Sequence, residues 1–237
     1  MNDTEYRSLV DRDVAHLIHP QYLQGDQRSA IIFARGEGSV LTDVRGNEYI
    51  DGLSSLWNVA VGHGRKELAE AAAQQMSTLA FANGYTGYSN VPAIELAERL
   101  CNLSYANMDA VFFANSGSEA NEVAFKLARF YWYLRGNMDK VKIFARRQAY
   151  HGGTLATTAA TGLPPFWRGF GPLDPTFLRT PCNHPFTSCT AECAEAFGEA
   201  IEREGPDTVA AIIAEPVQGA GGVIPPGANY FPKLRQV

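Results

Sequence analysis

The sequence lacks the features that mark secreted, membrane-bound and nucleic-acid-binding proteins. It has four cysteines in 237 residues, too few for a disulfide scaffold of this size. No run approaches the length of about 18 apolar residues that a membrane-spanning helix needs. The net charge is −5, and no basic run provides a local basic face for nucleic acid. We therefore expect neither a membrane nor a nucleic acid as a partner.

The remaining absences concern targeting and metals. The first segment, MNDTEYRSLVDRDVAHL, contains four acidic residues and no apolar core of the signal-peptide type, so we expect a cytoplasmic protein. Cys182, His184, Cys189 and Cys193 are close in sequence, but the last two follow a CxxxC spacing and no CxxC pair is present. Structural zinc sites use CxxC pairs, so we expect no metal and reduced, partly buried thiols.

The first third of the chain predicts a small β meander. The composition is that of a globular protein, with 46% apolar and 19% charged residues. Residues 1–28 show little periodicity, and Pro20 would break an early helix. At 40–52, VLTDVRGNEYIDG alternates apolar and polar residues around a turn at Gly46 and Asn47, which is typical of a hairpin. We expect residues 1–64 to precede a larger domain.

From about residue 65, helical patterns alternate with short apolar runs. Apolar helix faces are predicted for Leu68, Ala72, Met76 and Leu79, for Ile94, Ala97 and Leu100, for Val123, Leu127, Phe130 and Leu134, and for residues 191–204. AVFFA at 110–114, KIFA at 142–145 and VAAIIA at 209–214 lack alternation, as in strands covered on both faces. Residues 162–188, rich in proline and aromatic residues, indicate a long packed loop. This order predicts an α/β fold with a mostly parallel sheet and ligands outside the carboxyl ends of its strands.

The stretch FFANSGSEANEVAFKLAR at 112–129 is the most informative. Ser116 and Glu119 have the spacing of a capping box, which starts a helix after a buried strand. Gly117 allows close backbone approach, so the free amides of Gly117 and Ser118 face outward beside the Ser118 hydroxyl. Such a helix start attracts an anion by ~0.3–1 kcal/mol per surface charge, and a phosphate suits it. A helix that is merely well capped is the alternative. The GxSxG, GxxxxGK[ST] and GxGxxG motifs are absent.

Five segments together resemble the class III (ω-amino acid) aminotransferases, which use pyridoxal 5'-phosphate (PLP) on the type I fold. They are DGLSSLWNVAVGHG (51–64), FANGYTGYSN (81–90), FFANSGSEANEVAFKLAR (112–129), AYHGGT (149–154) and AEPVQGAGGVIPP (214–226). The set is most similar to ω-transaminases that transfer an amino group from an amine or ω-amino acid to pyruvate. The resemblance implies an α/β, type I PLP-dependent transferase fold. It makes residues 1–64 the N-terminal segment of the small domain, and residues 65–237 the first part of the large PLP-binding domain.

The resemblance also implies roles for single residues. Gly117 and Ser118 match residues that bind the PLP phosphate, which agrees with the capping argument. Tyr150 matches a residue that stacks on the pyridine ring, and Glu215 matches an acid near the cofactor. Without the resemblance, Tyr150 would be a core or interface aromatic and Glu215 a solvated loop acid. We assign His151 no proton-transfer role, because a lone histidine is more often a hydrogen-bonded structural residue.

Three further residues match the substrate side of the family's site. Leu56 and Trp57 resemble the hydrophobic wall of the amine pocket, and Tyr85 resembles a residue lent by the neighbouring subunit. Simple packing is the alternative for Trp57. The resemblance therefore implies a homodimer in the full-length form, with an amine or amino acid and a 2-oxo acid as substrates.

The family's catalytic lysine has no match among the lysines of this chain, which are Lys66, Lys126, Lys140, Lys142 and Lys233. The aspartate that pairs with the pyridinium nitrogen also has no match, and in the family both residues lie beyond the counterpart of Val237. We therefore expect an N-terminal portion of an aminotransferase that contains no Schiff-base lysine and is inactive alone. Two alternatives stay open: another class III reaction, such as aminomutase or decarboxylase chemistry, and a non-catalytic fragment.

Overall fold

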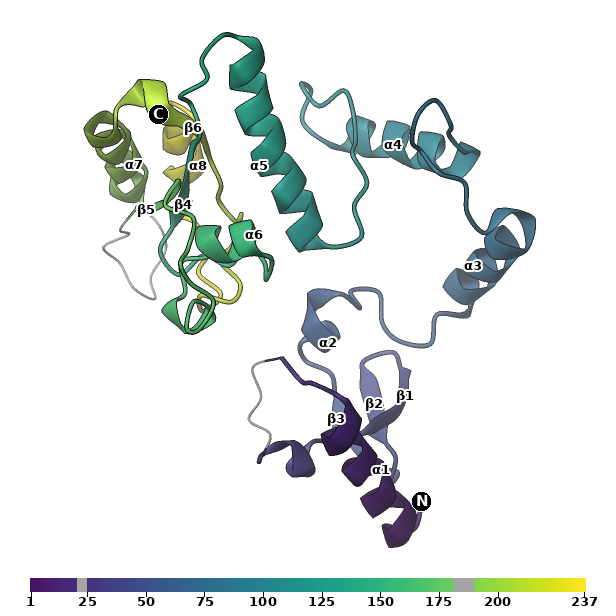
Figure 1. Ribbon diagram of the computed structural model, residues 1–237. Coiled ribbons are helices and arrows are strands. Elements are labelled where there is room, and N and C mark those ends of the chain that lie inside the picture. Colours follow the sequence, from purple (N-terminus) through teal and green to yellow (C-terminus); the bar gives the residue numbers. More distant parts are fainter. Residues whose placement is uncertain (21–24, 181–189) are drawn as a thin grey trace. The chain divides into compact units, whose positions relative to one another are not determined.

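The computed structural model describes residues 1–20, 25–180 and 190–237, which divide into two compact units (Figure 1). The first unit is Met1–Leu96 and the second is Ala97–Val237. The domain boundary expected after residue 64 concerns the family's small and large domains and stays a prediction. Within the described ranges, no helix is long and apolar enough to cross a membrane.

The first unit begins with a helix that the sequence analysis missed, α1 (Asp3–His16). A capping box starts it: Asn2 Oδ1 accepts the Glu5 amide at 2.9 Å, and Glu5 Oε2 accepts the Asn2 amide at 3.0 Å. Only Val10 of this helix is buried. Because the helix is mostly solvated it needs no long apolar face, so its signal lies in the Asn2-x-x-Glu5 spacing and not in periodicity.

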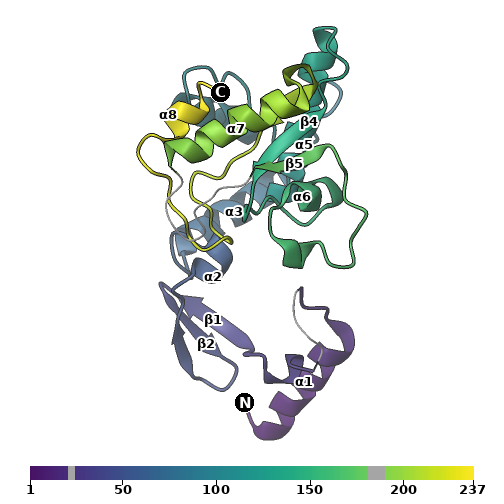
Figure 2. The same ribbon diagram turned by 90° about the vertical axis from the view of Figure 1, so that its left-hand side faces the viewer.

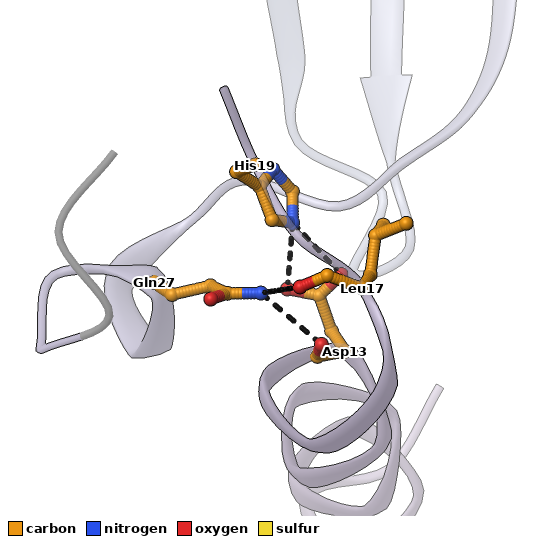
Figure 3. A network of polar contacts seen from close by, with 4 residues as sticks. All are labelled: Asp13, Leu17, His19 and Gln27. Atoms are coloured by element: carbon orange, nitrogen blue, oxygen red, sulfur yellow. Dashed lines mark hydrogen bonds and ion pairs between the residues drawn. The ribbon is translucent and has the colours of Figure 1, made fainter. Parts of the chain in front are cut away.

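A polar network fixes the chain after α1 (Figure 3). Gln27, in the 3₁₀ turn Gln27–Ser29, donates from Nε2 to the carbonyl oxygens of Asp13 and Leu17, at 3.1 and 2.9 Å. His19 Nε2 lies 3.0 Å from Asp13 Oδ1, and this hydrogen bond lowers the pKa of the Asp13 carboxyl group. Gln27 thus donates to carbonyl oxygens at the end of α1 that would otherwise bind water.

The predicted β meander is confirmed as an antiparallel sheet of β1 (Phe33–Glu37), β2 (Val40–Asp43) and β3 (Glu48–Ile50), in that order. The predicted turn joins β2 to β3, with Gly46 at a φ of +92°. The Asp43 carboxylate accepts the amides of Arg45 and Asn47, at 2.8 and 2.9 Å. Hydrogen bonds from Asn47 dominate the environment of this group and lower its pKa to about 2.

Three helices follow, α2 (Ser54–Trp57), α3 (Lys66–Leu79) and α4 (Val91–Leu103). The predicted helices at α3 and α4 are confirmed, and Asn90 Oδ1 accepts the Ala93 amide at 3.0 Å near the start of α4. The apolar face that was expected to be the buried side of α4 is not buried, and no residue of α3 is buried either, in the part of the chain that the structure describes. Periodicity shows which face is apolar, but not which element covers it.

The second unit contains the predicted parallel sheet, in the order β5 (Phe177–Thr180), β4 (Lys142–Arg146), β6 (Val209–Ile212). Ile143 packs with α5 (Gly117–Leu134) and α6 (Leu155–Ala160) on one face. The next residue, Phe144, packs with α7 (Ala191–Glu204) and α8 (Tyr230–Leu234) on the other (Figures 1 and 2). Short 3₁₀ turns occur at Pro164–Phe166 and Pro206–Thr208. Helices on both faces confirm the α/β class.

Two expectations about strands and loops are wrong. Residues 110–114 form no strand: no strand pairs with them in the described ranges, and Phe112 is 67% exposed. Residues 162–188 are not one continuous loop, because β5 lies within them and pairs with β4. The last part of that segment, residues 181–188, lies outside the described residues.

The predicted apolar face of α5 is not the face that packs on the described sheet. Leu127, Phe130 and Leu134 are exposed, whereas Phe125 is 5% exposed and its ring meets Phe177 edge to face at a centroid distance of 4.9 Å. Trp132, two turns along the helix, donates from Nε1 to the Ala210 carbonyl of β6 at 2.8 Å. The helix therefore has two apolar faces, and the described sheet contacts the narrower one.

Candidate functional site

The start of α5 is built as the sequence predicts, with one difference. Ser116 has extended backbone angles, and its Oγ accepts the Glu119 amide at 3.1 Å. The reciprocal half of the capping box is absent: Glu119 Oε2 accepts the backbone amide and the side-chain amide of Asn115, at 2.8 and 3.0 Å. The acidic side chain of the first turn is thus turned toward Asn115.

The amides of Gly117 and Ser118 have no hydrogen-bond acceptor in the part of the chain that the structure describes. A Cβ atom built on Gly117 would meet nothing within 4 Å, so the space in front of this turn is open. Ser118 Oγ accepts the Gly153 amide at 3.1 Å, which leaves the hydroxyl proton free to donate. Free donors at the positive end of an 18-residue helix form an anion-binding geometry.

Hydrogen bonds join this helix start to the segment that carries Tyr150. Besides the Gly153 amide on Ser118, Asn121 Nδ2 donates to the His151 carbonyl at 2.8 Å. Tyr150 is 37% exposed, and its ring lies 5.1 Å from the ring of Phe166. A partly exposed aromatic ring thus lies on a segment whose backbone is hydrogen-bonded to the helix that presents the free amides.

Glu215 fixes the same segment from the end of another strand. Its Oε1 accepts the Tyr150 amide and its Oε2 accepts the Gly219 amide, both at 3.0 Å. Its backbone carbonyl accepts a hydrogen bond from the buried Arg146 side chain of β4. The structure thus brings together, in the second unit, the hydrogen-bonded segments that carry four of the predicted site residues: Gly117, Ser118, Tyr150 and Glu215.

His151 is buried beside this group. Its amide donates to Thr161 Oγ1 at 3.0 Å, and its Nε2 has no hydrogen-bond partner among the described residues. Burial, and then the positive charge of Arg146, lower the pKa of His151 to about 4. The imidazole is therefore neutral at pH 7, and the absence of a proton-transfer role for His151 stays a prediction.

The substrate-side residues lie in the other part of the chain. Leu56 and Trp57 belong to the short, irregular α2, where Trp57 is 54% exposed. Tyr85 is exposed in the turn between α3 and α4, and its amide donates to Asn83 Oδ1 at 3.0 Å. Their placement relative to the cofactor residues stays a prediction.

The backbone of α2 is a feature that sequence reasoning missed. Ser54, Ser55 and Trp57 have φ values of +50°, +60° and +63°. For residues with a Cβ atom this conformation costs about 1–3 kcal/mol each and persists only where surrounding contacts impose it. The Asp51 carboxylate accepts the Ser55 amide at 2.8 Å, and His63 Nε2 lies 2.8 Å from Asp51 Oδ2; both residues lie within the resembling segment 51–64.

No group of three or more metal-ligating side chains occurs within the described ranges. Of the cysteines considered for a metal, Cys193 is buried in α7, whereas Cys182 and Cys189 lie outside the described residues, as does His184.

Solved transaminases share this fold. A transaminase from the marine bacterium Virgibacillus is 46% identical with a TM-score of 0.92, over 97% of this chain and 52% of that chain. The ω-transaminase of Pseudomonas jessenii, solved in complex with PMP, is 36% identical with a TM-score of 0.90, over 96% of this chain and 53% of that chain. The fold class is thus that of the PLP-dependent transaminases.

Sequence comparison narrows the class to a family. The model of class III aminotransferases matches residues 22–237, and the chain belongs to that family. A probable aminotransferase of Mycobacterium tuberculosis is 45% identical over 214 residues, which cover 87% of this chain and 46% of the relative. The chain spans about half the length of the curated relatives it matches.

Proposed function

We propose that this chain provides the phosphate and ring sites of a PLP-dependent aminotransferase. In its full-length form, that enzyme transfers an amino group from an amine or ω-amino acid to a 2-oxo acid such as pyruvate. We further propose a cytoplasmic homodimer, in which Leu56 and Trp57 line the amine pocket and Tyr85 reaches the neighbouring subunit's site.

The observation that carries the proposal is the pair of free amides at Gly117 and Ser118, held against the Tyr150 segment. A phosphate fits this turn because the donors have no acceptor and the position in front of Gly117 is open. The Ser118 hydroxyl adds a third donor, and its oxygen is already held by the Gly153 amide. The residues present therefore suit the cofactor that the family implies.

Each residue has a distinct task in this proposal. Gly117 and Ser118 bind the phosphate, and Tyr150 offers its ring to the pyridine. Glu215 orients Tyr150 by accepting its amide, which holds the backbone that carries the ring. When bound, PLP supplies the electron sink on which amino-group transfer depends. We propose that the chain alone does not turn over, because none of its five lysines matches the catalytic lysine of the family.

Cofactor binding tests the proposal without requiring turnover. Pyridoxamine 5'-phosphate is the suitable probe, because it lacks the aldehyde that reacts with lysine amines. We expect saturable binding by equilibrium dialysis, and competition by inorganic phosphate. Gly117→Val should weaken binding by about tenfold or more, because its side chain fills the open space before the amides. Ser118→Ala should also weaken it.

A matched control separates loss of the site from loss of the fold. Gly25, like Gly117, has open space around it and no positive φ, so Gly25→Val makes the same change in the first unit, at a residue without a proposed role. Binding by Gly25→Val should equal that of the parent. Unsaturable binding by the parent chain, or equal binding by Gly117→Val and the parent, would refute the proposal.

A further inference from the structure

The strained segment Ser54–Trp57 is held at one end by a partly buried Asp51–His63 hydrogen bond that the family resemblance does not explain. His63 Nε2 lies 2.8 Å from Asp51 Oδ2, and the two side chains are 18% and 7% exposed. Both carboxylate oxygens of Asp51 also lie 2.8 Å from the amide of Ser55. Asp51 therefore contacts both His63 and Ser55 of the strained segment.

The ring of His63 is itself fixed against the sheet. Its backbone pairs with Gly38, with hydrogen bonds of 2.9 and 3.1 Å in the two directions. A Cβ atom on Gly36 would lie 2.7 Å from His63 Cγ, so the imidazole covers the bare backbone of β1 at that point. His63 is thus fixed to the sheet, Asp51 is hydrogen-bonded to His63, and Ser55 is hydrogen-bonded to Asp51.

The carboxylate is held in its charged form by these contacts. The hydrogen bond from His63, followed by that from the Ser55 amide, lowers the pKa of Asp51. A charged carboxylate accepts a stronger hydrogen bond from an amide than a neutral acceptor does. The Asp51–Ser55 hydrogen bond can therefore offset part of the cost of the positive φ at Ser55. Within the segment, the Trp57 amide donates to the Leu53 carbonyl at 3.0 Å and the Asn58 amide to the Ser54 carbonyl at 3.1 Å.

We propose that Asp51 and His63 are positioning residues, which hold the segment Ser54–Trp57 with its positive φ values at Ser54, Ser55 and Trp57 and so orient Leu56 and Trp57 as the wall of the amine pocket. The pair acts on substrate choice through the backbone and touches no substrate itself. This inference rests on the proposed function for the pocket, and on the observed contacts for the mechanism. Without the pair, the segment relaxes toward ordinary φ values and the Trp57 side chain changes direction.

Two measurements on the full chain test the pair. Amide hydrogen exchange reports on Ser55, Trp57 and Asn58, and fluorine NMR with fluorotryptophan reports on the three tryptophans, the Trp57 signal being assigned by Trp57→Phe. Asp51→Ala and His63→Ala should lower protection of the three amides by about tenfold or more and shift the Trp57 resonance. His63→Gln places an amide nitrogen where Nε2 lies, and should restore both readouts.

The chain offers internal controls. Trp132 and Trp167 belong to the second unit, where they donate to the carbonyls of Ala210 and Thr161. Their resonances should not move in these variants. Asp13 and His19 form a comparable pair at 3.0 Å elsewhere in the first unit, so Asp13→Ala should leave the Trp57 signal unchanged.

The outcomes are decisive. Unchanged protection at Ser55 and Trp57 in both alanine variants overturns the proposal. The proposal is also overturned if the amides of β2 and β3 lose as much protection as those of Ser55, Trp57 and Asn58, because Asp51 and His63 would then stabilise the whole sheet. A chain that shows the expected local effects but fails to bind pyridoxamine 5'-phosphate refutes the aminotransferase proposal and, with it, the pocket role of the pair. That failure is distinguishable because it leaves the exchange and fluorine results intact.

Discussion

Replacement of Phe125 by alanine tests which face of α5 packs on the sheet. Phe125 is 5% exposed and packs among Ile143, Ala159, Ala160 and Phe177, so its removal leaves a cavity between helix and sheet. Such a change costs about 3–5 kcal/mol. With a urea m-value of about 2 kcal/mol/M, the unfolding midpoint of the second unit should fall by roughly 2 M.

The matched variant is Phe130→Ala on the same helix. Phe130 is 53% exposed, and alanine is the better helix former by about 0.5 kcal/mol, so the net cost should stay below about 1 kcal/mol. Urea denaturation followed by circular dichroism, repeated at two protein concentrations to detect association, measures both variants. A cost for Phe125→Ala no larger than that for Phe130→Ala would refute the packing described for α5.

Two further predictions concern pH. The pKa of Asp43 is lowered to about 2, so the β2–β3 turn should keep its stability above pH 4 and lose it as the pH falls toward 2. The Asn47 amide resonance should report this transition, and Asp43→Asn should abolish it. His151 has its pKa lowered from 6.5 to about 4, so unfolded chains bind a proton that folded chains do not. The second unit should therefore lose up to about 1.4 kcal/mol per pH unit between those values as the pH falls. Urea titrations at pH 7, 6 and 5 should show this slope, and His151→Phe should flatten it; a flat parent profile contradicts the prediction.

Features set by neighbouring residues are the ones that sequence alone predicts well. The hairpin turn at Gly46, the cap at Ser116 and the end of α7 at Gly205 each depend on a few adjacent residues, and each is present. The strands β4 and β6 were also predicted, because an apolar run without alternation is typical of a central parallel strand.

Features that depend on distant partners were predicted less well. Residues 110–114 have a strand-like composition, but a strand exists only where another pairs with it, and none does so here in the described ranges. The apolar residues of α5 lie on two faces, and sequence periodicity favoured the wider one although Phe125 is the buried residue. The helices α3 and α4 are confirmed, but the side of α4 that was expected to be buried is not, because a helix face is buried only where another element covers it.

The candidate site shows the same division between local and distant causes. The free amides follow from the local cap at Ser116, whereas the approach of Tyr150 depends on contacts with Ser118 and Glu215, which lie far from each other in sequence. In both contacts the segment that carries Tyr150 contributes a backbone amide, that of Gly153 to Ser118 and that of Tyr150 to Glu215. A backbone amide is present whatever the side chain is. These hydrogen bonds therefore fix the position of the segment without requiring a tyrosine at position 150. In the proposed site, Ser118 and Glu215 thus hold the segment that carries Tyr150, while the amides of Gly117 and Ser118 and the ring of Tyr150 face the ligand.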